Sequence, residues 1–513
     1  MYKKSDDLFE LIKSLLQTEK RYFKLSASKH KGEKNYMKLF NVIDKQKEYD
    51  EEAIKKLFAG QKFIRRLDVT KSYLYNLILQ SSETYHSNID MELRSKLNHI
   101  QFLLGKELYA QCEKIISRTR QLAEAHEKHL IILELSELEM EFIRSQSYRG
   151  RTEQETEKSF AEMIGVNNKF IYAKEYEQLA TKYFIRNYQR RSVNPQVDST
   201  GYSDIMNHPF LCINPEDNPK RKREFSYEAL SYYYNIHSAY SFMRNEYSDA
   251  YSHALKSVQL MEDNPLQIKD KPHIYIARLS NLVLCQENLK KYDEVVLTLK
   301  KLKGLRSYSV KIKSQLFYVI NSTELIMYID TGQFEKGEKL ITSIQNEFNR
   351  VRLSKHREMI LYYNISYIYF GSQNYRQALN YLNKIINDSV TDVRSDIHCF
   401  ARILNLLVHF ELDNKNLLEY IVKSTHRFLY KRNRLYKVEN SILNFIKNKL
   451  PKAITQNKLI QAFKELKTEM EEIMKDPFER KTLEYFDFIS WLESKIESRP
   501  FTEIVREKVR LKK

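Results

Sequence analysis

The sequence contains little glycine and proline. Only 10 glycines and 9 prolines occur among 513 residues, about 2% each, where roughly 7% and 5% are usual. A large β-sandwich, or an α/β enzyme that holds phosphate in a glycine-rich loop, needs more glycine than this. Because 42% of the residues are apolar, wholesale disorder is excluded as well. We therefore expect an all-α protein.

Cysteine and long apolar runs are also scarce. The cysteines lie more than 70 residues apart, at Cys112, Cys212, Cys285 and Cys399. Neither a CxxC redox pair nor a zinc cage is expected from this spacing, and isolated thiols suit a reducing compartment. The N-terminus has acidic residues where a signal peptide has its apolar core, and no run approaches the ~20 apolar residues that cross a bilayer. We expect a cytoplasmic protein without membrane insertion.

Positive charge exceeds negative charge, and much of the surplus is local. The 85 lysines and arginines against 67 acidic residues give a formal net charge of +18. Residues 421–460 contain ten basic side chains and a single acidic one, Glu439. A basic surplus favours acidic protein, nucleic acid or anionic lipid as a partner, without choosing among them.

The organisation of the chain follows its proline and its apolar periodicity. We expect helices over Lys34–Lys45, over Glu51–Phe58 and from Val69 to about His86. Thr152 and Glu155 have the spacing of a capping box at a helix start. Four of the nine prolines and the basic run Lys220–Arg223 mark a connector. The predicted parts are an N-terminal helical module (1–90), helical hairpins (91–190), the connector (191–225), four repeats (226–390) and a C-terminal part (391–513).

Four segments of residues 226–390 share one pattern. An aromatic residue is followed three positions later by a small or β-branched residue, and four and seven positions further on by small or apolar ones. The aromatic residues, separated by 45, 42 and 41 positions, are Tyr247, Tyr292, Phe334 and Tyr375. The pattern predicts helical hairpins in which the small residue allows close approach of two helices and the aromatic closes the seam at the turn. One hairpin cannot cover its own apolar face, so neighbours must stack.

These segments resemble the tetratricopeptide repeat (TPR) family. The clearest instance is the segment 362–382, in which the residues that fit the family signature are Tyr362, Ile365, Ser366, Tyr369, Tyr375 and Ala378. The resemblance covers about 226–390 and is plausible at 91–145, around Gly105, Tyr109 and Cys112. It implies a right-handed α-α solenoid. The period exceeds the family's 34 residues, which would also suit HEAT-type repeats, and Val283 and Leu325 occupy an upstream position that is usually small.

The C-terminal part resembles a degenerate fifth unit with a cap. Apolar helices are expected over Phe400–Leu412 and Leu417–Leu450. In the string Asp476-Pro-Phe-Glu479, an N-cap, a first-position proline and a capping-box glutamate predict a helix start. The helix that follows carries Leu483 and Trp491, and we expect it to cap the solenoid.

Catalytic and cofactor signatures fail on inspection. Gly332 and Gly337 have the spacing of a phosphate loop, but Glu338 stands where the lysine must be. His126 and His129 are three positions apart, whereas an HExxH zinc site needs four. We therefore expect a non-enzymatic protein without metal or cofactor.

The TPR resemblance implies that the first helix of each hairpin lines a partner-binding groove. Small polar residues interrupt these otherwise apolar helices at Asn235, Ser280, Ser322 and Asn364. They are candidates for ligand contact, although such a ladder can also arise by chance. Apolar residues stand where the family's carboxylate clamp has lysine and arginine, so capture of a C-terminal carboxylate is not expected. Apolar anchoring of a partner segment is instead suggested by Tyr232, Phe242, Tyr367 and Phe370.

Two further segments could contact phosphate. On one helix Arg427, Lys431 and Arg434 would form a basic stripe, with Arg432 and Lys437 beside it, unless this is simply a solvated face. Residues 51–59 and 69–78 vaguely resemble a helix-turn-helix module, although their link is longer than the three or four residues expected. Its candidate contacts are Lys71, Tyr73, Tyr75 and Asn76. The plain alternative is a helical cap.

The sequence thus favours a scaffold or adaptor that binds a partner polypeptide along a TPR-like groove. The alternative is a nucleic-acid-binding regulator that uses the N-terminal module or the basic 421–460 stretch, with the repeats as sensor. That layout resembles peptide-responsive bacterial regulators with a DNA-binding domain before their repeats. A structural subunit of a larger assembly is a third possibility.

Overall fold

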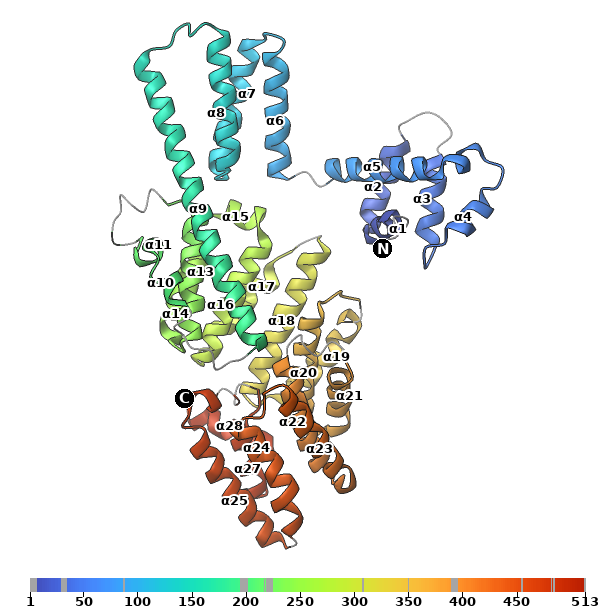
Figure 1. Ribbon diagram of the computed structural model, residues 1–513, viewed down its shortest axis with the longest axis vertical. Helices are drawn as coiled ribbons and strands as arrows, with labels where there is room; N and C mark the ends of the chain where they lie inside the picture. The colour runs from blue at the N-terminus through green and yellow to red at the C-terminus, as the bar shows by residue number, and fades with distance from the viewer. Residues whose placement is uncertain are drawn as a thin grey trace. The chain divides into compact units, whose positions relative to one another are not determined.

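The computed structural model is helical throughout its described part (Figure 1). No strand occurs in that part, so the prediction of an all-α protein is confirmed. The described residues are 7–28, 35–85, 88–193, 202–215, 217, 225–306, 309–348, 350–388, 395–453, 455–480, 482 and 485–511.

The chain forms two compact units, Met1–Asn167 and Asn168–Lys513. The division falls inside the long helix α9 (Glu153–Val193). That helix begins with the expected capping box, in which the Glu155 amide donates to Thr152 Oγ1 at 3.2 Å and the Thr152 amide donates to the Glu155 carboxylate at 3.0 Å. The predicted connector lies inside the second unit, and its basic run lies outside the described residues.

The first unit contains two groups of helices, each around its own core. The first group confirms the helices expected at its three predicted segments. It consists of α1 (Asp7–Ser14), α2 (Gln17–Ser28), α3 (Asn35–Lys45), α4 (Glu51–Leu57), a 3₁₀ turn (Lys62–Arg66) and α5 (Leu67–Tyr85). The second group consists of α6 (Ile89–Leu104), α7 (Tyr109–Ala125) and α8 (His129–Ser145), in which α7 packs on both neighbours.

The second unit is built mainly from successive helical pairs. In the chain order, α16 packs on α18, α18 on α20, and α20 on α22, while each also packs on the helix that follows it. The pairs are α13 (Tyr227–Met243) with α14 (Tyr247–Glu262), α16 (Pro272–Asn288) with α17 (Tyr292–Gly304), α18 (Val310–Asp330) with α19 (Phe334–Phe348), α20 (Lys355–Gly371) with α21 (Tyr375–Ile386), and α22 (Ser395–Glu411) with α23 (Lys415–Lys431). Short helices α10 (Ser203–Met206), α11 (Pro209–Cys212) and α15 (Pro265–Asp270) accompany them.

One turn geometry joins the two helices of the four repeated pairs. Each repeat aromatic is the first residue of the second helix, and a residue two positions earlier has a left-handed backbone. These residues are Asn245, Lys290, Gly332 and Gln373, with φ of 65°, 59°, 66° and 63°. In the third repeat the Gln333 amide donates to the Tyr328 carbonyl at 2.8 Å, as in a Schellman C-cap. A residue with left-handed backbone also lies two positions before the start of α7, α8 and α23. These residues are Glu107, Glu127 and Asp413.

The small residues of the repeats allow close helix packing, as expected. Ala250 and Ala378 are fully buried three positions after their aromatic residues. At Gly337 a Cβ atom would lie 2.5 Å from Ile368 Cδ1, which is closer than atoms pack. The space beside Gly371, the last residue of α20, is smaller still, because a Cβ there would lie 2.3 Å from the buried ring of Phe334.

The C-terminal part differs from expectation at two helix boundaries. The predicted helix 417–450 is broken after Lys431, because Asn433 has φ of 52° and the Arg434 amide donates to the Leu429 carbonyl at 3.0 Å. A helix does begin at Pro477, as predicted, but it ends at Arg480, and its Glu479 carboxylate accepts from the Lys437 and Val438 amides. The helix that carries Trp491 begins at Phe488, and Leu483 lies outside the described residues. The elements are α24 (Lys437–Asn444), a π turn (Phe445–Lys449), a 3₁₀ turn (Leu450–Lys452), α25 (Gln456–Ile473), α26 (Pro477–Arg480), α27 (Phe488–Glu497) and α28 (Phe501–Leu511).

We expect Gly371→Ala to destabilise the second unit by about 1–3 kcal/mol, since the added methyl group must displace a buried aromatic ring. Thermal unfolding followed by circular dichroism measures the effect. Gly304→Ala is the matched control, because a Cβ at this α17 position of the same unit meets nothing within 4 Å. An equal midpoint for both variants would contradict the packing described.

Candidate functional site

Three of the four polar residues predicted to line the groove take part in hydrogen bonds between successive first helices. Asn281 Nδ2 donates to Asn235 Oδ1 at 3.1 Å, and Asn364 Nδ2 donates to Ser322 Oγ at 3.5 Å. The Ser280 hydroxyl bonds its own helix, at the Ile276 carbonyl. These polar atoms are therefore satisfied within the protein, which offsets the cost of burying them. Their contact with a partner stays a prediction.

Asn364 does not occupy the same place as the other three predicted residues. Asn235 and Ser322 stand twelve positions before their repeat aromatic, whereas Asn364 stands eleven before Tyr375. The residue twelve before Tyr375 is Tyr363, whose hydroxyl donates to the Tyr485 carbonyl at 3.0 Å. The residue twelve positions before the aromatic of one pair therefore contacts the residue eleven positions before the aromatic of the next pair. The hydrogen bonds Asn235–Asn281 and Ser322–Asn364 both show this.

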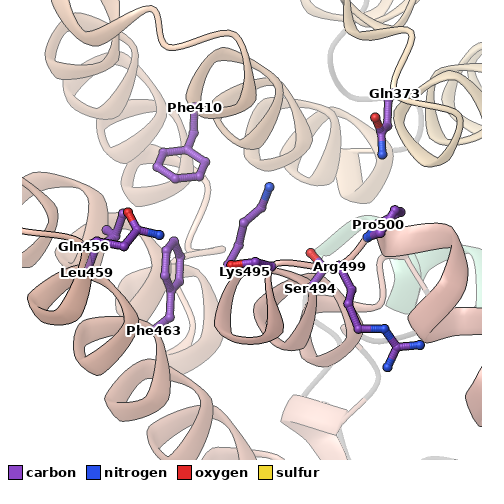
Figure 2. A pocket seen from close by; sticks show the side chains of 10 residues that line it. Gln373, Phe410, Gln456, Leu459, Phe463, Ser494, Lys495, Arg499 and Pro500 are labelled. Carbon is purple, nitrogen blue, oxygen red and sulfur yellow. The ribbon is translucent and has the colours of Figure 1, made fainter.

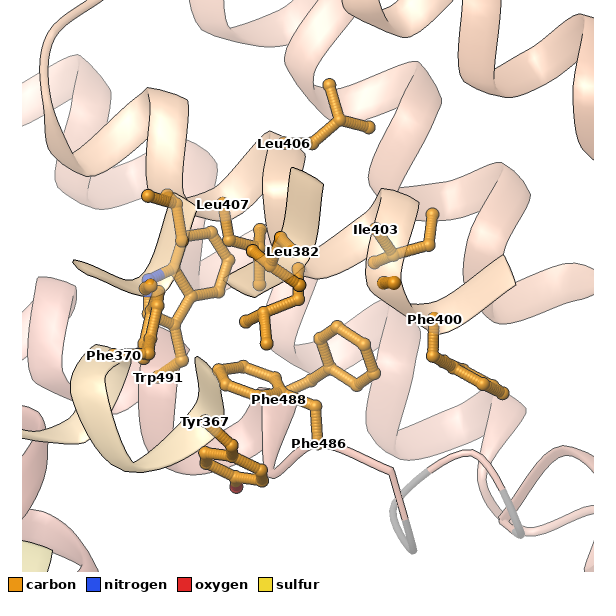
Figure 3. Packing of buried hydrophobic residues seen from close by; sticks show 14 of the residues in the cluster. Tyr367, Phe370, Leu382, Phe400, Ile403, Leu406, Leu407, Phe486, Phe488 and Trp491 are labelled. Carbon is orange, nitrogen blue, oxygen red and sulfur yellow. The ribbon is translucent and has the colours of Figure 1, made fainter. Parts of the chain in front are cut away.

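Tyr367 and Phe370 do not face an open groove. The residues that follow α26 cover them, and their exposed fractions are 7% and 1%. The Asp487 amide donates to the Tyr367 hydroxyl at 3.0 Å, and the Phe486 ring centroid lies 5.0 Å from that of Tyr367 and 5.1 Å from that of Phe370. Figure 3 shows these rings gathered with Phe488 and Trp491. The apolar anchoring expected of a partner is here provided by the chain itself.

The same helix face is more open earlier in the chain. Eight positions before each repeat aromatic stand Ala239, Leu284, Ile326 and Tyr367. Leu284 on α16 is 43% exposed, and Ala239 and Ile326 are half-buried. Tyr232 is half-buried on α13, where burial and Glu177 raise its pKa to about 12. Phe242 packs on Tyr247 at the turn, with ring centroids 5.3 Å apart.

The predicted basic stripe is divided between a helix and a turn. Arg427 and Lys431 are exposed on α23, and neither makes an ion pair with any described residue. Arg434 lies beyond the helix end, so it does not continue their row. Arg432, the C-cap residue, places its guanidinium 3.9 Å from the Phe428 ring centroid, and Arg402 of α22 lies 4.0 Å from the same centroid. Lys437 is exposed at the start of α24, 4.0 Å from Asp476. We call Arg402, Arg427, Lys431 and Arg432 the basic cluster.

The acidic residue of this stretch does not neutralise the surface. Glu439 is 2% exposed, and burial raises its pKa to about 7. Glu479 is also buried and raises that pKa further, while Arg434 opposes the change. These two carboxylates therefore lie inside the fold next to the start of α24. They do not offset the positive charge that the basic cluster presents at the surface.

The N-terminal candidates do not act together. Lys71 is buried, and its ammonium group donates to the Glu51 carboxylate, which lowers the pKa of Glu51 to about 2. This ion pair holds α5 against α4, so the Lys71 ammonium group is engaged within the fold, and its contact with nucleic acid stays a prediction. Tyr73 and Asn76 are exposed on α5, and Tyr75 is half-buried.

A small open cavity lies between α22, α25 and the end of α27. Its volume is about 400 Å³. Lys495 extends into the opening, whereas Arg499 points away from it (Figure 2). Both cations are matched by carboxylates, Lys495 by Glu411 and Arg499 by three glutamates, so the cavity offers no unpaired charge. The lining residues are Gln373, Phe410, Gln456, Leu459, Phe463, Ser494, Lys495, Ser498, Arg499 and Pro500.

Among the buried charged residues that the sequence analysis missed is Arg278 on α16. Its side chain is 8% exposed, and its Nη2 donates to Ser231 Oγ of α13 at 3.3 Å. The signal in the sequence was a single arginine among the apolar residues Tyr275, Leu279 and Leu282 of a first helix.

Other site types are not found in the described residues. They include no group of three or more histidine, cysteine, aspartate or glutamate side chains that could hold a metal ion. None of the helices they form is long and apolar enough to cross a membrane. Comparisons of the chain with protein-family models, curated proteins and solved structures give no match.

Glu439 should make the stability of the second unit depend on pH. Its folded pKa, about 7, exceeds the ordinary value of 4.5, so the folded state binds the extra proton between these values. The stabilisation is therefore complete below about pH 4.5 and is lost as pH rises through about 7, by roughly 3 kcal/mol at most. Thermal midpoints between pH 5 and 8 measure it.

Glu439→Gln, which stays neutral, should flatten this dependence relative to the parent protein. Glu419→Gln is the control, since this glutamate is exposed on α23 and pairs with Lys423. If Glu439→Gln leaves the slope against pH unchanged, the buried carboxylate does not titrate in this range.

Proposed function

We propose that the chain is a non-enzymatic scaffold or adaptor that binds a partner polypeptide along a TPR-like array of first helices. The proposal includes a right-handed solenoid arrangement of the four hairpins that resemble the TPR family. It is supported by the shared turn geometry and by the ordered contacts from α16 through α18 and α20 to α22.

The observation that carries the proposal is the seating of the chain's own polypeptide on α20 and α22. Tyr363 and Tyr367 bond main-chain atoms of Tyr485 and Asp487, and apolar rings fill the space between them. Further along, Thr502 Oγ1 donates to the Gly371 carbonyl at 2.6 Å. Main-chain hydrogen bonds give affinity for any sequence, while apolar pockets select side chains. A face of this kind suits the binding of a polypeptide segment.

The partner in this proposal occupies the part of the face that the chain leaves open. Leu284 is the counterpart of Tyr367 on α16, and its exposed fraction is 43% where that of Tyr367 is 7%. Ala239 and Ile326 continue the face on α13 and α18. A partner segment with apolar side chains would cover these residues as Phe486 covers Tyr367.

We expect Leu284→Arg to abolish retention of the partner polypeptide, because a charge would be buried in the contact. The full chain, carrying an affinity tag, is purified from its native cells at about 0.5 M salt. At this ionic strength the attraction between exposed charges is largely screened. Retained polypeptides are identified by mass spectrometry and compared between variants.

Leu297→Arg is the matched control, since Leu297 lies on the second helix of the same pair and is 58% exposed. A polypeptide retained by the parent and by Leu297→Arg, but not by Leu284→Arg, supports the proposal. Equal retention by both variants, or none by the parent, contradicts it.

A second candidate function, binding of nucleic acid by a regulator, is favoured by the basic cluster. Arg427 and Lys431 are exposed cations without ion pairs in the described part, and Tyr430 beside them is 69% exposed. Cations flanked by exposed aromatic rings suit phosphate contact with base stacking. In this alternative the repeats act as the sensor, and Tyr73, Tyr75 and Asn76 are the remaining candidates of the N-terminal module.

For this alternative we expect the affinity for labelled single-stranded DNA or RNA to fall linearly on a log–log plot against salt. The double variant Arg427→Ala/Lys431→Ala should reduce that slope by about 1.4–1.8, at 0.7–0.9 for each phosphate that the protein no longer neutralises. Fluorescence anisotropy measures it. The control Lys415→Ala/Lys423→Ala removes two cations of the same helix that already pair with Asp413 and Glu419. Equal slopes for the two double variants would refute specific use of the cluster.

A further inference from the structure

Arg278 is a buried cation that has no counter-charge in the described part of the chain. No ion pair of its guanidinium occurs among the residues that the structure describes, and its Nε has no hydrogen-bond partner there. Its bond to Ser231 Oγ, at 3.3 Å, is long for this type of contact. Burial lowers the pKa of the guanidinium to about 10, which leaves it charged at neutral pH. The described part of the fold therefore holds a desolvated positive charge that no carboxylate of that part neutralises.

Packing alone does not account for an arginine at this position. Arg278 stands fourteen positions before the repeat aromatic Tyr292. The residues fourteen positions before the other three repeat aromatics are Tyr233, Ile320 and Leu361. Leu361 is fully buried and Tyr233 is 4% exposed. The other repeats fill this position with an apolar or aromatic side chain, so the helical pair has no structural need for a cation here.

The polar groups around Arg278 lie on the preceding first helix, α13. The phenol groups of Tyr227 and Tyr232 on α13 are close enough to influence its charge. The carboxylates nearest to Tyr232, those of Glu177 and Glu228, already pair with lysines. The lysine nitrogens lie 2.7 Å and 3.2 Å from these carboxylates, on Lys174 and Lys271 respectively. Negative charge near the site is thus committed elsewhere.

We propose that Arg278 is an anion-binding residue that receives a carboxylate of the partner segment between α13 and α16. This inference rests on the proposed scaffold function and specifies the chemistry of the partner, an acidic segment. Arg278 would bind the carboxylate through its guanidinium edge. Planar guanidinium and carboxylate groups can form two parallel hydrogen bonds, the strongest arrangement for such a pair.

The energetics favour this use of the residue. A buried charge without a partner costs stability, and a ligand that supplies the opposite charge recovers part of that cost on binding. The chain's net charge of +18 attracts an acidic segment from a distance. Arg278 then provides a defined contact for one carboxylate between α13 and α16.

The experiment uses small carboxylates, so it does not depend on the partner. The full chain is titrated with N-acetyl-glutamate α-amide, which carries a side-chain carboxylate, and with N-acetyl-leucine, which carries a main-chain carboxylate. Sodium chloride at equal ionic strength is the blank, and the thermal unfolding midpoint is the readout. We expect at least one carboxylate to raise the midpoint of the parent protein above the chloride value, and the responding compound identifies the source of the group.

Arg278→Met should lose this rise completely. Without added carboxylate its midpoint should equal or exceed that of the parent, because a desolvated charge has been replaced by an apolar side chain of similar length. Arg427→Met, which removes an exposed arginine, should respond as the parent does. The same rise in Arg278→Met and the parent, or no rise in the parent with either compound, would overturn the assignment.

A second measurement covers the case in which Arg278→Met does not fold. With ¹⁵N-labelled arginine, the Arg278 Nε–H resonance of the parent, assigned by its absence in Arg278→Lys, should shift on addition of the carboxylate that raised the midpoint. An unmoved resonance would overturn the proposal. If the parent protein retains no partner polypeptide but the Arg278 resonance shifts with carboxylate, the scaffold function alone is rejected. If a partner is retained but no carboxylate changes the midpoint or the resonance, only this inference is rejected.

Discussion

Each helical pair of the second unit depends on its neighbours to cover its apolar face. Leu325, Ile368 and Leu404 lie on the successive first helices α18, α20 and α22, and each is at most 1% exposed within one shared core. A single pair would leave such side chains in water, at a cost of roughly 1.5–3 kcal/mol for each. Close approach at the turns makes this covering possible, and the left-handed turn residues and Gly371 are what permit that approach.

An array of this kind needs its last face covered, and the C-terminal segment covers it here. Trp491, the single tryptophan, is buried, and its Nε1 donates to Glu411 at 2.7 Å. Arg506 donates to the Gly332 carbonyl at 2.8 Å, so α28 also satisfies a main-chain group at the end of an earlier helix. The segment that completes the fold thereby covers the faces of α20 and α22, whereas Leu284 on α16 stays exposed.

The local features of this fold could be predicted from the sequence. The helix that starts at Tyr375, the capping box of Thr152 and Glu155, and the small residue Ala378 all depend on neighbours within a few positions. Their spacing contains the information because helix periodicity and capping act over three to eleven residues. The break at Asn433 was missed, since a left-handed asparagine between two basic residues has no strong local signal.

The roles of the site residues depended on contacts that no local pattern contains. Tyr367 was expected to anchor a partner segment, whereas in the structure Asp487, 120 positions later in the chain, covers it. Lys71 was expected to contact phosphate, whereas in the structure its ammonium group pairs with Glu51. The sequence by itself determined the helices, their turns and their repeat, because these follow from local sterics and periodicity. Only the tertiary structure decided which charges are paired and which face is open, because burial and pairing are set by residues distant in the chain.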